Sequence, residues 1–134
     1  MKAMLDDALR FHQTALNVQA RRQELLASNI ANADTPNYKA KDIDFRSALA
    51  GALGKQGAAL NMKTTSAKHL PVAGATPFEG HIGFRQELQS AVDGNTVNMD
   101  VERAAYAENS LHYEASLTFI NGLLSGMRTA ITGQ

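Results

Sequence analysis

Cysteine and tryptophan are absent from the 134 residues of this chain, and only 6% of its residues are aromatic. Without cysteine there is no disulfide framework and no thiolate chemistry. With so few large aromatic side chains, the core must be built mainly from Ala, Leu, Ile and Val, and the many alanines favour close contacts between helices. The thirteen basic and thirteen acidic residues cancel, which leaves no electrostatic reason to expect nucleic acid or an anionic membrane as the main partner.

Long hydrophobic runs are also missing. No stretch of about 20 apolar residues occurs, so we expect no transmembrane segment. The first residues, MKAMLDDALRFHQ, carry acidic side chains where a cleavable signal peptide has an apolar run. If the protein leaves the cytoplasm, we therefore expect it to do so without a cleaved signal peptide. The length predicts a single domain over residues 1–134.

A long helix is predicted at the N-terminal end, in residues 1–35. Apolar and small residues recur at three- and four-residue spacing from about Met4 to Ala33. The apolar pattern weakens between Gln19 and Gln23. This weakness favours a helix that depends on a partner over a helix that is tightly packed in a core.

A second long helix is predicted at the C-terminal end, in residues 98–134. It should begin at Asn98 or Asp100, either of which is a good N-cap, and run to about Thr132. Each helix would be about 45–50 Å long, which is more than a small domain needs. Because long helices with a narrow apolar stripe depend on tertiary contacts, we expect both to be poorly ordered in the free monomer.

The middle of the chain, residues 36–97, is predicted to be irregular. A short helix is expected near Phe45 to Leu53, a short strand or hairpin within residues 69–84, and a turn at Asp93-Gly94. So long an irregular segment is unusual inside a compact domain. The predicted fold is therefore mainly α, with the two terminal helices pairing as a coiled coil and packing on copies from neighbouring chains.

The first helix should end in a dense polar turn. Pro36 disfavours helix at Thr35, and the side chains of Asn32 and Asp34 can hydrogen-bond nearby backbone groups. Asn37 follows the proline, where a left-handed residue is often needed, and Asn tolerates that conformation. The local physics leaves two interpretations open at equal weight: a helix stop, or a contact surface.

The same stretch carries a resemblance. SNIANADTPNYKAKDIDF resembles the signature of the flagellar rod and hook family of axial proteins, in which a helix ends in Asn-Ile-Ala-Asn followed by Thr-Pro-Gly/Asn-Tyr. The segment GNTVNMDVERAAYAENSLHYEASLTFINGLLSGMRTAI is similar to the C-terminal helix of a short member, and TTSAKHL is a weaker match. The departures are Asn37, where many relatives have Gly, and Asn121-Gly122, where relatives often carry a longer polar or basic residue.

The resemblance implies a structural subunit of the proximal rod of the bacterial flagellar basal body, which polymerises through its terminal helices and transmits torque. It implies export by the flagellar type III apparatus and a place in the periplasmic rod. The implied partners are other copies of the chain, other rod proteins, the adaptor protein at the rod base and the membrane ring. No enzyme activity and no cofactor are expected. The alternative is a soluble helical adaptor or export chaperone that binds partner helices.

The resemblance also makes the polar turn a subunit contact, with hydrogen bonds between protomers or between the two helices. The interface candidates combine this turn with the apolar stripes of both helices: Leu9, Leu16, Leu26, Asn29, Ile30, Asn32, Asp34, Pro36, Tyr38, Leu111, Ala115, Phe119, Leu123 and Met127. Phe45 and Leu49 look like the Phe-x-x-x-apolar export signal of early flagellar subunits. Ordinary packing of a short helix is the competing interpretation, and it is slightly favoured.

Catalytic and metal motifs give no competing signal. No nucleophile elbow, zinc-protease motif, P-loop or dinucleotide fingerprint occurs. Glu108 and His112 have the spacing of two metal ligands on a helix, but no third ligand is apparent, so a surface pair is favoured.

Three short features each leave two interpretations. Asp42 and Asp44 are expected to be solvated or to form salt bridges at an interface. The pair at residues 21–22, Arg-Arg, is either a solvated face or a partner for an acidic segment of another protomer. Gly122 and Gly126 mark either a fraying helix end or the close approach of a neighbouring helix.

Overall fold

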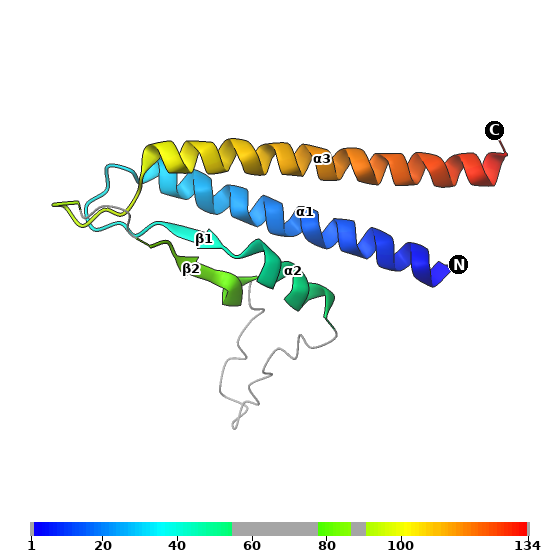
Figure 1. Cartoon of the computed structure of the whole chain (residues 1–134), viewed down its shortest axis with the longest axis horizontal. Coiled ribbons are helices and arrows are strands. Elements are labelled where there is room, and N and C mark those ends of the chain that lie inside the picture. Colours follow the sequence, from blue (N-terminus) through cyan, green and yellow to red (C-terminus); the bar gives the residue numbers. More distant parts are fainter. Residues whose placement is uncertain (1, 55–77, 87–90, 134) are drawn as a thin grey trace, which may run out of the picture.

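The computed structural model describes residues 2–54, 78–86 and 91–133. Two long antiparallel helices, α1 (Lys2–Ala31) and α3 (Met99–Thr132), dominate the chain, and both termini lie at the same end (Figure 1). The predicted mainly helical architecture, with paired terminal helices, is confirmed. In the described residues, neither helix contains a segment long and apolar enough to cross a membrane.

Local signals set the ends of these helices. Helix α1 ends two residues earlier than predicted, because the amide of Asn32 already bonds to the carbonyls of both Ser28 and Asn29 in a tightened last turn. Helix α3 begins where predicted, after Asn98, whose side chain accepts hydrogen bonds from the amides of residues 100 and 101. Gly133, with φ of 72°, closes its C-terminus.

A small β-hairpin-like unit and a short helix fill the middle. Strand β1 (Lys41–Ile43) pairs antiparallel with β2 (Ile82–Phe84), so that Ile43 lies opposite Ile82. Helix α2 (Phe45–Leu53) follows β1, and the 3₁₀ turn η1 (Glu79–His81) precedes β2. The predicted short helix is confirmed. Of the predicted extended segment at 69–84, residues 82–84 are confirmed as a strand, and residues 69–77 lie outside the described part of the chain.

The core is small and lies between α1 and the β1–α2 segment. Val18, Ile43 and Ala48 are buried together, with Phe45 and Phe78 among the partly buried side chains around them. Helix α1 therefore packs on both sides, against α3 on one side and against α2 and β1 on the other. Helix α3 packs mainly against α1, which leaves much of its surface open.

Candidate assembly surfaces

The polar turn after α1 is held from inside by Asn29, which is fully buried. Its Nδ2 donates to the carbonyl of Lys41 at 2.8 Å and to the carboxylate of Glu102 at 3.1 Å. Its Oδ1 accepts from the amide of Lys41 at 3.0 Å and from the hydroxyl of Tyr38 at 3.3 Å. Asn29 thus uses every donor and acceptor of its amide group and joins α1, β1 and α3.

A second buried asparagine, Asn95, lies in the segment before α3 and stabilises the end of α1. Its Nδ2 lies 3.0, 2.8 and 2.8 Å from the carbonyl oxygens of Asn32, Ala33 and Thr35. These carbonyls lie at the helix end, where intrahelical donors run out. The side chain of Asn32 closes the turn locally, since it donates to the carbonyl of Ser28 and accepts from the hydroxyl of Thr35.

The two predicted turns, at residues 36–37 and 93–94, pack against each other. Asn37 has φ of 60° and Gly94 has φ of 73°, so the left-handed conformation expected at Asn37 is confirmed. The amide of Asn37 donates to the carbonyl of Asp93 at 2.9 Å. A Cβ atom on Gly94 would lie only 2.6 Å from Asn37 Oδ1, so residue 94 requires glycine for both space and conformation. Asp34 and Pro36 are exposed at the rim of this turn.

Four charged side chains form a chain of ion pairs beside Asn29. Arg22 holds Asp42 through two bonds of 3.0 and 3.2 Å, and Arg85 bonds to Asp42 at 2.6 Å and to Glu102 at 2.5 Å. The two positive and two negative charges cancel. They connect α1, β1, the segment after β2, and α3. Glu102 is 1% exposed, whereas Arg22, Asp42 and Arg85 are half-buried, so the group reaches from the interior to the surface. We call these four residues, with Asn29 and Asn95, the polar base.

The charges of the polar base shift two pKa values. Burial alone would raise the pKa of Asp42, but hydrogen bonds from Arg22 and Arg85 outweigh it and hold that pKa below its ordinary value. The hydrogen bond to Asp42 raises the pKa of Arg22. Asp42 therefore stays ionised in the folded chain at neutral pH.

Two expectations for charged residues need correction. Asp42 was expected to be solvated or to bind another protomer, and Arg22 to be solvated or to bind another protomer, but they pair with each other inside the chain. Because the two residues are twenty positions apart in the sequence, local sequence patterns do not predict this pairing. Asp44 has a different role: it is exposed and caps α2, accepting from the amides of Arg46 and Ser47.

The centre of the α1–α3 contact is also polar, which sequence reasoning missed. Asn109 is 2% exposed and donates to the carbonyl of Gln19 at 2.9 Å and to the side chain of Gln23 at 2.5 Å. Gln23 in turn donates to the hydroxyl of Ser110 at 2.7 Å. The weak stripe between Gln19 and Gln23 was the available signal, because it marks where α3 must supply polar partners.

The interface candidates on α1 and α3 differ in exposure. Leu26 is fully buried within the chain, and Leu9, Leu16 and Ile30 are half-buried. On α3, the exposed fractions of Leu111 and Phe119 are 67% and 65%. The remaining three candidates on α3 also differ among themselves: Ala115 is exposed, whereas Leu123 and Met127 are half-buried.

This spread on α3 has a geometric cause. A row of residues spaced by four turns about 40° around an α-helix at each step. The row from Leu111 to Met127 therefore winds from the solvent side toward α1 and does not form one face. Asn29 lies in α1 and is fully buried, so its hydrogen bonds stay within the chain and join α1 to β1 and α3. For Asn32 and Tyr38, contact with another protomer stays a prediction.

The remaining sequence features are also placed. Phe45 packs against the core, and Leu49 is half-buried in the same helix. An added Cβ at Gly122 or Gly126 would meet nothing within 4 Å, so no other part of the described chain approaches them closely. Glu108 and His112 form an exposed pair at 3.7 Å, as expected. No group of three metal-ligating side chains occurs within the described residues.

An apolar groove of about 510 Å³ runs along one flank of the helix pair. Its walls come from both long helices: Ala20, Gln23, Glu24, Ala27, Ser110, Tyr113 and Glu114. The small side chains of Ala20 and Ala27 lie on the α1 side of the groove, and Tyr113 lies on the α3 side. An apolar groove of this kind can bind a side chain of another helix.

Comparison with known proteins identifies the family. A family model described as "Flagella basal body rod protein" matches residues 9–39, from the third turn of α1 through the polar turn. "Flagellar basal body rod protein FlgB" of Yersinia enterocolitica is 46% identical over 130 residues, with 95% of each chain covered. The protein of that name from Escherichia coli K12 is 47% identical over 130 residues, covering 95% of this chain and 94% of that protein. The chain belongs to the FlgB family.

A third relative matches along almost its whole length. The FlgB protein of Aeromonas hydrophila is 44% identical over 135 residues, covering 100% of this chain and 99% of that protein. Membership of the FlgB family confirms the resemblance and makes the chain a component of the flagellar basal body rod. It also fits the expectation of a structural protein and not an enzyme.

Proposed function

We propose that the chain is a subunit of the proximal rod that polymerises through its terminal helices and transmits torque. It leaves the cytoplasm through the flagellar type III apparatus and takes its place in the periplasmic part of the basal body. Its partners are other copies, other rod proteins, the adaptor protein at the rod base and the membrane ring. These statements extend FlgB family membership to the level of assembly.

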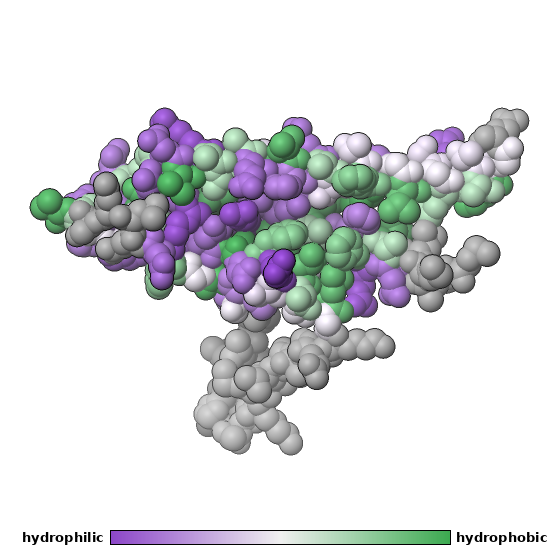
Figure 2. Space-filling view, viewed as in Figure 1, coloured by the Kyte–Doolittle hydropathy of each residue, from purple (hydrophilic) through white to green (hydrophobic). Residues whose placement is uncertain are grey.

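The observation that carries the proposal is the open surface of α3. Several large apolar side chains on the two long helices are at least 36% exposed: Phe11, Tyr106, Leu111, Tyr113, Leu117, Phe119, Leu124 and Ile131. Figure 2 shows apolar side chains gathered along the helix pair in the half nearer the termini. A helix with apolar residues on several sides needs burial that α1 alone does not supply.

The polar base supports the mechanical part of the proposal. Its ion pairs and amide bonds fix α1, α3 and the β1–β2 unit at one end of the helix pair. A subunit that passes torque to its neighbours must keep its shape, and satisfied buried polar networks specify one geometry. Head-to-tail contacts through the open helix surfaces then generate an open helical assembly when the rotation does not close.

The decisive experiment tests the outward side of α3 in flagellated cells. Leu111→Asp and Phe119→Asp place a charge in an exposed apolar position, and we expect loss of rods in electron micrographs and loss of motility. Ala50→Asp is the control, since Ala50 is exposed on another helix, α2. Circular dichroism of the purified chains checks that all three remain helical.

Two outcomes would contradict the proposal. Normal rods and motility with both Leu111→Asp and Phe119→Asp would remove the contact surface. Rods built by cells that lack the chain entirely would favour the alternative, an adaptor or export chaperone.

Phe45 and Leu49 remain the proposed export signal. In the folded chain Phe45 packs against Val18 and Ile43, so the export apparatus would read it in the unfolded chain. We expect Phe45→Ser to lower secretion of the chain strongly. Phe11→Ser, at an exposed phenylalanine, is the control, and equal secretion of both variants would contradict this role.

A further inference from the structure

Helix α3 carries a second apolar line, which lies beside the side that faces α1 and shares the half-buried Ile120 and Met127 with it. Its members alternate at spacings of four and three residues, the heptad pattern of a coiled coil: Tyr106, Ser110, Tyr113, Leu117, Ile120, Leu124, Met127 and Ile131. We call this line the α3 seam. Exposed fractions of 40% at Leu117, 46% at Leu124 and 85% at Ile131 show that the chain leaves much of this line uncovered.

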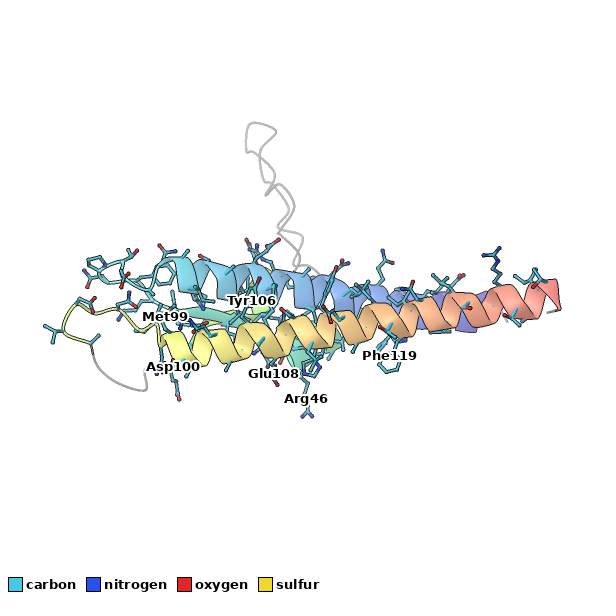
Figure 3. All side chains as sticks on the ribbon, turned by 90° about the horizontal axis from the view of Figure 1, so that it is seen from above. Arg46, Met99, Asp100, Tyr106, Glu108 and Phe119 are labelled. Carbon is cyan, nitrogen blue, oxygen red and sulfur yellow. The ribbon has the colours of Figure 1, made fainter. Side chains whose placement is uncertain are left out.

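The seam lies on the flank of α3 beside the apolar groove, since Ser110 and Tyr113 belong to both. Figure 3 shows Tyr106 on one side of α3 and Glu108 and Phe119 on the other, so the seam is distinct from the surface that carries Phe119. A helix laid along the seam would also touch Ala20 and Ala27 of α1. The seam and groove together therefore offer the third position of a three-helix arrangement.

Two unpaired charges flank the seam on its outer edge. Glu114 and Arg128 are separated by two heptads, with Asn121 midway between them. All three are exposed. Neither charge has an ion pair within the part of the chain that the structure describes. Along the chain this edge is negative at Glu114, neutral at Asn121 and positive at Arg128. It is therefore complementary in charge to the same edge of a second copy that runs antiparallel.

From this complementarity we infer that two free chains pair through their α3 seams, antiparallel and related by a two-fold axis near Asn121. Glu114 of each copy then faces Arg128 of the other, which gives two symmetric ion pairs. A parallel pair does not achieve this, because outer-edge residues then face the inner edge of the partner. The inner edge carries no charge over this span: Asn109, Ser116, Leu123 and Ala130.

The apolar residues select the same alignment independently. With the charges matched, Tyr113 faces Ile131, Leu117 faces Met127 and Ile120 faces Leu124, each pair occurring twice. Every residue in these layers is apolar or aromatic, and Ser110 falls outside them. Moving one heptad toward the N-terminus brings Ser110 opposite Met127 and shifts the two helices by about 10 Å along the axis, which takes Glu114 and Arg128 out of alignment.

The same alignment also fills the groove. It brings Ile131 of the second copy beside Tyr113, where the groove opens between α1 and α3. Ile131 is the most exposed large apolar residue of α3. Because a two-fold contact closes on itself, this pair is not the repeating contact of a rod, which requires head-to-tail interfaces. It is a state of the free chain in which pairing orders the end of α3, expected to be poorly ordered in the monomer, and covers apolar surface outside the assembly.

The test is sedimentation of the full chain between about 1 μM and about 1 mM, the range in which a modest helix pair dissociates. We expect a reversible monomer–dimer equilibrium. Glu114→Arg and Arg128→Glu each turn two attractive contacts into two repulsive ones, so each should weaken association about tenfold. The double variant restores both ion pairs and should restore association.

Mixing the two single variants gives the sharpest result. Each variant repels itself, but a chain with Glu114→Arg and a chain with Arg128→Glu complement each other at both contacts, so the mixture should form dimers as well as the original chain does. Arg46→Glu is the control, because Arg46 is exposed on α2 and the change in charge is the same. Circular dichroism confirms that every variant is folded.

Three results would overturn the inference: a monomer throughout the concentration range, a dimer that both single variants leave unchanged, or a failure of mixing to restore dimers. A dimer that Phe119→Asp abolishes, and that the charge variants do not affect, would place the contact on the other side of α3 and also overturn it. None of these results bears on rod formation in cells, so the proposed function stands or falls separately.

Discussion

The two halves of the helix pair differ in polarity: one is joined by buried polar side chains, and the other exposes apolar side chains. Near the polar turn, α1 and α3 meet through buried amides and charges, with Asn29, Glu102 and Asn109 almost fully buried. Toward the termini, the last part of α3, residues 117–132, carries a single charge, Arg128, and several exposed apolar side chains. Figure 2 shows this change from polar to apolar along the molecule. We call the two parts the base half and the outer half.

The difference gives the two halves separate roles: the base half fixes how α1 packs on α3, and the outer half supplies apolar surface for contacts. Buried polar groups are costly unless each finds its own partner, so the base half accepts one register of α1 against α3. Apolar side chains have no such directional demand and can be buried by α1, by a second copy or by another protein. For a rod subunit, as proposed, this division means that the base half fixes the shape of each chain while the outer half stays available for contacts.

The largest expected effect comes from breaking the base half at Glu102. Glu102→Ala leaves Arg85 without one of its two carboxylates in a buried site, which should lower the free energy of unfolding by about 3 kcal/mol. The comparison is Glu114→Ala, the same change at an exposed position of α3 outside the polar base, with an expected effect below about 0.5 kcal/mol. Urea unfolding followed by circular dichroism measures both. Equal losses would show that the two halves do not differ in this way.

A second test removes the clamp at the end of α1. Asn95→Ala strands the carbonyls of residues 32, 33 and 35, and we expect a loss of about 1–3 kcal/mol. Asn17→Ala, at an exposed position of α1, should have little effect. Hydrogen exchange of the amides in the last turn of α1 should rise in the first variant only. If exchange there is unchanged, Asn95 does not hold the helix end.

A third, smaller effect is expected at the paired turns. Gly94→Ala forces a Cβ toward Asn37 Oδ1 and places alanine at φ of 73°, which should cost about 1–2 kcal/mol. Gly80→Ala is the matched control, since a Cβ there meets nothing within 4 Å and its φ is ordinary. The thermal midpoints of the two variants should therefore differ, with Gly94→Ala the lower. Equal midpoints would show that the turns do not constrain the base half.

Local signals predicted the parts of the fold that are decided locally. The N-cap at Asn98, the turn at Asp93-Gly94 and the left-handed Asn37 each depend on a few neighbouring residues. Strand β1 was not predicted, because three residues are too few to show a periodic pattern.

The polar base escaped prediction for a different reason. Its pairs join residues far apart in the chain, such as Arg85 with Asp42 and Asn29 with Glu102. Among many surface charges, nothing in the sequence marks these four as buried. A usable signal exists in hindsight: Glu102 and Asn109 occupy the line of α3 that continues through the half-buried Ser116. Polar residues on a line that should be apolar indicate a buried network.

The smallest expected effect is the pH dependence of the base half, through Asp42. The pKa of Asp42 is lower in the folded chain than its ordinary value near 4, so the unfolded chain binds a proton more readily. The stabilisation is therefore fully present above about pH 5 and is lost as the pH falls through the folded pKa. Asp42→Asn should flatten the decline in unfolding free energy below about pH 5, whereas Asp34→Asn, at an exposed residue of the turn, should leave the slope as it is. Urea unfolding at a series of pH values measures the slope. An unchanged slope in Asp42→Asn would show that Asp42 does not contribute to the acid sensitivity of the base half.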